Sequence, residues 1–210
     1  LINILRLYHK RDLGKKKMDG PDRLIKMTKT RLETYSDSVM AIVITLLAFE
    51  LKTPVENSLN NFETFRGLIH LLPEFLVFVL SFLTISIMWI NHHYITSKIK
   101  EVNHRTVWAN STLLLFVCLI PFATSFLASN PNNQVALITY SVVMFLCSLT
   151  FSLLKMFSVP SRTRTHHKEK FRHVGLIFYS LSAITAFFVP QLAYLLLLVP
   201  PLSYTWPKNL

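Results

Sequence analysis

The residues best suited to do chemistry in this sequence gather in one apolar segment near its amino-terminal end. Between residues 34 and 50, the carboxylates Asp37 and Glu50 flank an apolar stretch that also carries the hydroxyls of Ser38 and Thr45. Ionisable side chains at membrane depth are costly and normally face protein or water rather than lipid. We therefore expect this segment to be central in its assembly.

On a helix, the spacing in this segment defines two strips. The first alternates hydroxyls with bulky apolar groups within about 60° of arc. It consists of Ser38, Ile42, Thr45 and Phe49. The second, rotated by roughly 100°, has mostly small residues, which permit close helix packing. It consists of Asp37, Ala41, Ile44 and Ala48. Two interpretations of the first strip stay open: it lines a pore, or it is the stripe that any apolar helix shows, with its hydroxyls bonded back to their own backbone.

A second group of polar residues is expected to meet the beginning of this helix. The first helix begins, the second ends and the third begins on the same side of the membrane. The residues placed at a similar depth to Asp37 are Arg31, Trp89, Asn91, His92, His93 and Asn110. Asp37 can accept hydrogen bonds from an imidazole, an amide or the Arg31 guanidinium, which offsets its desolvation. We interpret the group as a structural clasp that orients the first helix; a proton relay, or ordinary interfacial histidines, are the alternatives.

Membrane-spanning helices must position these residues. Charged residues make up 16% of the 210 residues, where about 25% is typical. Lys, Arg, Asp and Glu are absent from 75–97, 106–154 and 173–207. A span needs roughly 20 apolar residues, so these stretches hold one, two and two spans. This pattern excludes a soluble globular protein and predicts an all-α integral membrane protein. The six expected helices cover about 34–53, 65–95, 106–129, 134–157, 172–189 and 191–206.

The distribution of positive charge predicts the orientation of the chain. Of 22 Lys and Arg residues, 20 fall in the first 31 residues, the second-to-third and fourth-to-fifth loops and the carboxyl tail, against Lys52 and Arg66 on the other side. The positive-inside rule then places both termini of this multi-pass protein in the cytoplasm, and we expect the plasma membrane as its location. Nucleic-acid binding is set aside despite the net charge of +11. We expect a basic cytoplasmic segment over 1–30, in part upstream of a true start at Met27, and a transmembrane domain over 31–207.

Catalytic and cofactor chemistry find little support. Cys118 and Cys147 both lie in apolar runs, which argues against a disulfide framework or a zinc site. With four glycines and no Walker or dinucleotide loop, nucleotide chemistry is not expected. The histidines match no metal-ligand spacing. We therefore predict no enzyme, no cofactor and no metal; a metal-dependent membrane enzyme and a purely structural membrane protein are the competing interpretations.

The first helix resembles the signature of a known family, the transmembrane protein 175 potassium channels, which is usually written R-x-x-x-F-S-D. The similar residues here are Arg31-x-x-x-Tyr35-Ser36-Asp37, then Ala41-Ile42-x-x-Thr45-Leu46-Leu47 and Pro54. Further similar features are Trp89-x-x-His92-His93, Asn110 and Pro121-Phe122-Ala123-Thr124. The resemblance spans Met27 to the carboxyl end and is most specific over 31–54. Tyr35 departs from the family's Phe, keeping the ring and adding a hydroxyl.

The resemblance implies a single-repeat prokaryotic member: six helices per chain, a homotetramer in the lipid bilayer, and potassium ions passing between four copies of the first helix. It implies that Ile42 forms the apolar constriction, with Leu46 and Phe49 as further contributors, and that Thr45 and Ser38 line the pore. The sequence has no T-V-G-Y-G string, so a carbonyl filter of that type is excluded. The alternative function is a secondary ion transporter with a polar site between helices one to three, in which Pro121 and Pro190 interrupt helices.

Overall fold

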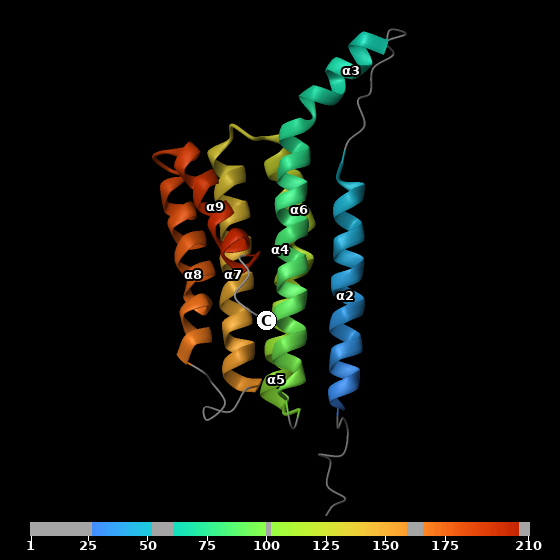
Figure 1. Ribbon diagram of the computed structural model, residues 1–210, viewed down its shortest axis with the longest axis vertical. Helices are drawn as coiled ribbons and strands as arrows, with labels where there is room; N and C mark the ends of the chain where they lie inside the picture. Colours follow the sequence, from blue (N-terminus) through green and yellow to red (C-terminus); the bar gives the residue numbers. More distant parts are fainter. Residues whose placement is uncertain (1–26, 52–60, 100–101, 159–165, 206–210) are drawn as a thin grey trace, which may run out of the picture.

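The described part of the chain is a bundle of helices whose long axes run side by side (Figure 1). The computed structural model describes residues 27–51, 61–99, 102–158 and 166–205. Its helices are α2 (Lys29–Phe49), α3 (Asn61–His70), α4 (Leu72–Ser97), α5 (His104–Cys118), α6 (Ile120–Ser129), α7 (Gln134–Ser158), α8 (His166–Thr185) and α9 (Pro190–Thr205). Within these ranges there are helices and no strands, so the all-helical fold class is confirmed.

Four segments of the described chain are long and apolar enough to cross a membrane. They are Lys29–Phe49, Leu72–Ser97, His104–Ser129 and Gln134–Ser158. The apolar parts of α8 and α9, His173–Thr185 and Pro190–Ser203, are shorter, and α9 ends near mid-height of the bundle (Figure 1). Six full spans per chain therefore stay a prediction.

Proline interrupts two of the helices that we expected to be continuous. The expected helix 65–95 is divided at Leu71 into α3 and α4, with Pro73 in the first turn of α4. The expected helix 106–129 is divided at Leu119 into α5 and α6, with Pro121 in the first turn of α6. Proline has no N–H to donate to the carbonyl four residues earlier, so the helical hydrogen-bond ladder is broken there. As a result α3 leans away from the bundle (Figure 1), whereas α5 and α6 together still form one segment long and apolar enough to cross a membrane.

Helix ends also differ from the expected ones. α2 begins at Lys29 rather than 34 because Thr28 caps it: the Thr28 hydroxyl accepts a hydrogen bond from the backbone N–H of Arg31 at 3.3 Å. It ends at Phe49 rather than 53. α3 includes 61–64, which we expected to be loop, and α8 begins at His166 rather than 172. Residues 1–26, Lys52, Pro54, most of the expected loop at 55–60, the basic loop 161–165 and Lys208 lie outside the described residues.

Packing makes α7 the centre of the bundle and α2 an edge. α7 contacts α5, α6, α8 and α9, whereas α2 packs against α4, α5 and α6. Figure 1 shows α2 beside α4 and on the opposite side of the bundle from α8. The largest fully buried side chains come from α2 and from α4 to α7, and they include Met40, Ile85, Leu113, Ile120 and Tyr140. One face of α2 thus lies on the bundle, and the other faces away from it.

Candidate functional site

The face of α2 that packs on the bundle is narrow and consists mostly of bulky apolar side chains. Its buried residues recur every three or four positions and are Leu32, Ser36, Met40, Val43 and Leu47. The strip of small residues that we expected to pack closely takes little part: Ala41 and Ala48 are exposed, and Ile44 is only partly buried. The packing surface within the chain is therefore a third strip, which we did not predict.

The strip that we interpreted as pore-lining lies on the opposite face of α2. Its four residues, Ser38, Ile42, Thr45 and Phe49, are all exposed in the single chain. Ile42 is 58% exposed and Phe49 is 85% exposed. At 100° per residue, this strip points roughly opposite to the buried one, and Leu46 flanks it at 46% exposed. An apolar face of this kind has to be covered by lipid, by another copy or by a narrow aqueous path.

The two hydroxyls of the exposed strip are bonded back to their own helix. Ser38 Oγ donates to the carbonyl of Thr34 at 2.8 Å, and Thr45 Oγ1 donates to the carbonyl of Ile42 at 2.8 Å. Each hydroxyl hydrogen is used, whereas each oxygen keeps acceptor capacity on a residue that is exposed in the single chain. Such oxygens act as acceptors, which suits them to contact a cation or water.

A buried hydrogen-bond network joins α2 to α4 and α5. Asn110 Nδ2 donates to Ser36 Oγ at 2.9 Å, and Asn110 Oδ1 lies 2.8 Å from His92 Nε2. Because an amide oxygen only accepts, Nε2 of His92 carries the proton. Ser36 Oγ also donates to the carbonyl of Leu32 at 2.9 Å. Ser36, His92 and Asn110 are at most 1% exposed, so this network is shielded from solvent and lipid alike.

A second polar contact lies beside this network, at a more exposed position. Trp89 Nε1 donates to Asp37 Oδ1 at 2.9 Å. The Trp89 ring stacks on His93, with centroids 6.4 Å apart and an interplanar angle of 28°. The donor to Asp37 is thus an indole, not the imidazole, amide or guanidinium that we expected.

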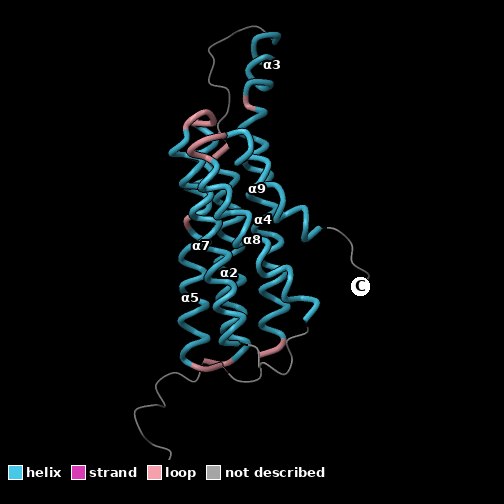
Figure 2. The backbone as a smooth tube through the Cα atoms, turned by 90° about the vertical axis from the view of Figure 1, so that its left-hand side faces the viewer, coloured by secondary structure: helices cyan, strands magenta, loops and turns pink. Residues whose placement is uncertain are grey.

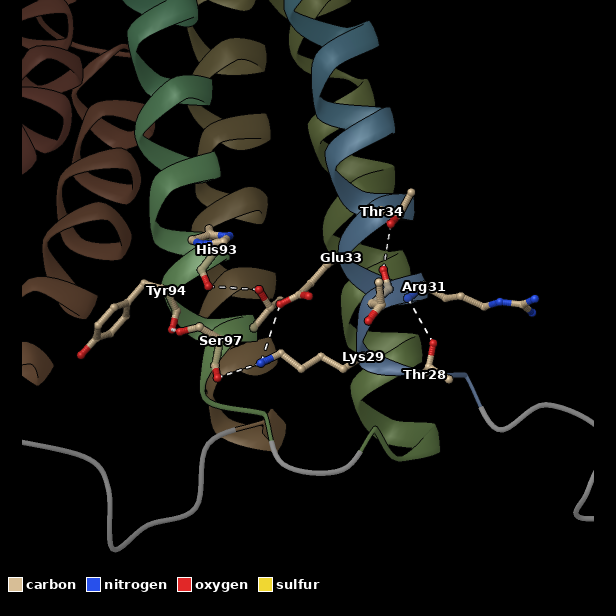
Figure 3. A network of polar contacts seen from close by, with 10 residues as sticks. Thr28, Lys29, Arg31, Glu33, Thr34, His93, Tyr94 and Ser97 are labelled. Atoms are coloured by element: carbon tan, nitrogen blue, oxygen red, sulfur yellow. Dashed lines mark hydrogen bonds and ion pairs between the residues drawn. The ribbon is translucent and has the colours of Figure 1, made fainter.

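Two members of the predicted cluster stand apart from it. Arg31 is exposed, and its guanidinium points away from α4 (Figure 3). Asn91 donates to the carbonyl of Ile87 in its own helix at 3.0 Å. Tyr35, 45% exposed, also lies outside the buried network. The structure therefore joins Ser36, His92 and Asn110, joins Asp37 to Trp89 and His93, and leaves the remaining three aside.

One contact between α2 and α4 escaped the sequence reasoning. Lys29 Nζ donates to the carbonyl of Ser97, 2.9 Å away in the last turn of α4, and lies 3.9 Å from Glu33 Oε1 (Figure 3). A cation at a helix carboxyl end is favourable because it meets the negative end of the helix dipole. In the sequence, Lys29 was one positive charge among ten near the amino terminus, so nothing distinguished it.

A second buried set of hydroxyls, between α4, α6 and α7, was also missed. Thr124 Oγ1 donates to Ser81 Oγ at 2.8 Å, and Ser81 Oγ lies 3.0 Å from the hydroxyl of Tyr140. All three are buried. Within the described residues, no group of three or more His, Cys, Asp or Glu side chains is placed to hold a metal ion.

The chain is similar to known ion channels over most of its length. The family described as endosomal/lysosomal potassium channel TMEM175 matches residues 31–121. A potassium channel of Chryseobacterium sp. (strain P1-3) is 33% identical over 173 residues, which are 80% of this chain and 87% of that protein. The bovine endosomal/lysosomal proton channel TMEM175 is 28% identical over 179 residues, which are 77% of this chain and 37% of that protein.

A solved structure is similar as well. The crystal structure of a lysosomal potassium-selective channel TMEM175 homolog from Chamaesiphon minutus matches with a TM-score of 0.77 and 28% sequence identity. The match covers 84% of this chain and 95% of that one. The family match over 31–121 contains the exposed strip of α2. It also contains the buried network of Ser36, His92 and Asn110 and the outer contact of Asp37 with Trp89.

Proposed function

Because this chain belongs to the TMEM175 family of ion channels, we propose that it is a potassium-selective cation channel of the cell membrane, in which four copies of α2 surround a central pore. Each subunit crosses the membrane six times, with both termini in the cytoplasm. The observation that carries the proposal is the exposed strip on α2, which alternates Ser38, Ile42, Thr45 and Phe49 on the face opposite to the packed one. The chain is accordingly a transport protein and not an enzyme.

In the proposed pore, Ile42 forms the narrowest ring. Four branched apolar side chains around one axis leave a passage that dewets easily, so ions pass only when the ring widens or stays wet. Ile42 is 58% exposed in the single chain, which leaves its side chain available for such a ring. Leu46 and Phe49 extend the apolar lining toward the other end of α2.

Next to this ring, the hydroxyls provide the contacts that favour potassium. Because Thr45 Oγ1 already donates its hydrogen to the carbonyl of Ile42, its oxygen is left to act as an acceptor in the pore. Four such oxygens replace part of the hydration shell of a passing cation. An incomplete oxygen ring favours potassium, which gives up its shell more readily than sodium. Ser38 plays the same role closer to the cytoplasm.

The buried network holds α2 at the rotation that this pore needs. Turning α2 by the 100° of one residue moves Ile42 off the axis and breaks the contact of Ser36 with Asn110, whose amide is held in place by His92 of α4. A buried hydrogen bond between membrane helices contributes about 1 kcal/mol. We therefore assign the network the role of a clasp, with Asp37 and Trp89 as its outer part.

Proton conduction is a second candidate, because the bovine relative is named a proton channel. The hydrogen-bonded series Ser36–Asn110–His92 contains a single ionisable side chain, His92, and Asn110 cannot pass a proton on without changing its amide. This argues for the clasp. A secondary transporter, the remaining alternative, is expected to show paired repeats, and we find none in the sequence.

The deciding experiment measures flux from liposomes that contain the purified chain. A potassium gradient is expected to drive dye-reported flux well above that of a sodium gradient, without need for a counter-ion. Equal potassium and sodium flux contradicts the selectivity, and flux that requires a second ion gradient supports a transporter. A pH-sensitive dye in parallel liposomes reports protons.

Cysteine substitution tests the placement of α2. In a Cys118→Ser background, Ile42→Cys and Thr45→Cys channels are expected to be blocked by a water-soluble thiol reagent. Val43→Cys is the matched control, because Val43 is 2% exposed and lies on the packed face. Block at position 43 but not at 42 or 45 means that α2 presents a different face to the pore.

A further inference from the structure

A groove between α5 and α7 opens at the end of the bundle where α2 begins. Its volume is about 350 Å³, and it lies between the first half of α5 and the second half of α7. These two helices run side by side (Figure 2). Its wall from α5 includes His104, Arg105, Trp108 and Ala109, and its wall from α7 includes Leu153 and Phe157.

The chemistry of the groove changes along its length. The cationic Arg105 and the imidazole of His104 lie in the first turn of α5. The ring of His104 packs edge-on against Trp108, with centroids 6.0 Å apart. Deeper in the groove, the two threonine hydroxyls that line it are bonded within their own helices, at 2.8 Å to the carbonyls of Trp108 and Leu146. The deeper part is therefore effectively apolar.

The exposed face of α5 continues this apolar surface toward the middle of the membrane. Trp108 is 62% exposed, and Leu115, two turns further along the same face, is 59% exposed. Tryptophan is enriched where a membrane protein crosses the interface, because its ring is apolar and its N–H is polar. The order of positive charge, indole and apolar surface matches the order of phosphate, glycerol and acyl chain in a phospholipid.

We propose that this groove binds one anionic phospholipid of the cytoplasmic leaflet, with its phosphate against Arg105 and its acyl chain along Ala109, Leu153 and Phe157. The choice of leaflet rests on the orientation in the proposed function. Charge complementarity supports an anionic headgroup: among the described residues that line the groove, none is acidic. Basic pockets between membrane helices on the cytoplasmic side are a recognised form of anionic-lipid site.

Native mass spectrometry of the purified channel with added phosphatidylglycerol or phosphatidylcholine tests this site. We expect one tightly held phosphatidylglycerol per chain, and Arg105→Gln is expected to reduce its preference over phosphatidylcholine by about fivefold, the usual contribution of one basic residue. Arg66→Gln is the matched control: it makes the same charge change in α3, beyond the opposite end of the bundle. Ala109→Trp, which fills the groove without changing charge, is expected to remove the bound lipid.

Two results overturn the proposal. One is an Arg105→Gln channel that binds phosphatidylglycerol as the unsubstituted protein does. The other is an Ala109→Trp channel that still binds the lipid but assembles with a different number of subunits. That result means that the groove is occupied by a neighbouring copy of the chain. The measurement reads mass and not ion flux, so its failure is distinct from failure of the channel proposal.

Discussion

The two faces of α2 differ in what surrounds them and in the kind of residue they carry. The packed face buries Leu32, Met40, Val43 and Leu47 around the polar Ser36. The opposite face exposes Ile42 and Phe49 beside the hydroxyls of Ser38 and Thr45. On the packed face a single polar residue has its partners within the chain, whereas on the exposed face each hydroxyl has only its own backbone.

This difference separates two tasks within one helix. Buried polar groups with complete hydrogen bonds fix one arrangement of the surrounding helices, since the alternatives leave them unsatisfied. Exposed hydroxyls with free lone pairs do not fix a fold, but their oxygens are able to interact with a passing cation or water molecule. We therefore expect substitutions on the packed face to reduce stability and substitutions on the exposed face to change conduction.

Asn110→Leu is expected to have the largest effect on stability. It removes both contacts of the clasp, and leaving buried polar partners unsatisfied costs about 1–3 kcal/mol for each. We expect a drop of several degrees in the apparent melting temperature of the purified protein, and a lower yield of the assembled form. Size-exclusion chromatography after a temperature series measures both.

Asn91→Leu is the control for this prediction. It makes the same change on α4, at an amide whose described hydrogen bond is to its own helix. The melting temperature of this variant is expected to stay close to that of the unsubstituted protein. If the Asn110→Leu protein is as stable as the Asn91→Leu protein, the buried network does not hold α2 in place.

Ile42→Asn is expected to have the largest effect on conduction. A polar amide keeps the constriction wet, so cation leak should rise by about tenfold, which corresponds to about 1.4 kcal/mol in the barrier. Stability should change little, because Ile42 is 58% exposed in the subunit. Liposome flux and a melting curve on the same preparation measure the two quantities.

Ile90→Asn provides a control of matched type and exposure. Ile90 lies on α4 and is 59% exposed, so the same polar substitution is made on another surface of the subunit. Its leak is expected to equal that of the unsubstituted channel. Unchanged currents in both Ile42→Asn and Ile42→Ala exclude Ile42 as the gate.

Thr45→Val is expected to have a smaller, selective effect. Removing the hydroxyl oxygen while keeping the shape should lower the potassium-to-sodium flux ratio by about threefold, a change of under 1.4 kcal/mol in relative barrier height. Thr139→Val on α7 is the control, since its hydroxyl makes the same kind of bond to its own helix, to the carbonyl of Val135 at 2.8 Å. A preserved ratio in Thr45→Val means that this oxygen takes no part in selectivity.

The distinction between the two faces was only half predictable from the sequence. The strip of Ser38, Ile42, Thr45 and Phe49 follows from helical periodicity, because its hydroxyls stand out against an apolar background. The packed strip does not, since Met40, Val43 and Leu47 suit lipid and protein equally well. In a membrane, apolar periodicity alone does not separate the surface that meets protein from the one that meets lipid.

The polar contacts show a similar limit. The sequence predicted one group of Asp37, Trp89, His92 and Asn110, because the ends of consecutive helices lie at the same depth on one side of the membrane. The pairing within the group depends on the rotation of each helix and on side-chain reach, so the indole rather than the Arg31 guanidinium meets Asp37. The helix breaks at Leu71 and Leu119 were predictable from Pro73 and Pro121, but the expected helices continued across both prolines.

Trp89→Phe is expected to have the smallest effect, and it tests where the clasp ends. The substitution removes the hydrogen bond to Asp37 and keeps most of the ring that stacks on His93. Trp89 is 43% exposed, so solvent or headgroups replace the lost donor, and we expect a loss of about 0.5–1 kcal/mol with conduction retained. Asp37→Asn is the control, because an amide oxygen still accepts from the indole and only the charge is lost. If Trp89→Phe lowers the melting temperature as much as Asn110→Leu does, the outer contact holds α2 as strongly as the buried network. The surface of α2 that stabilises the fold then includes Asp37 as well as the packed face.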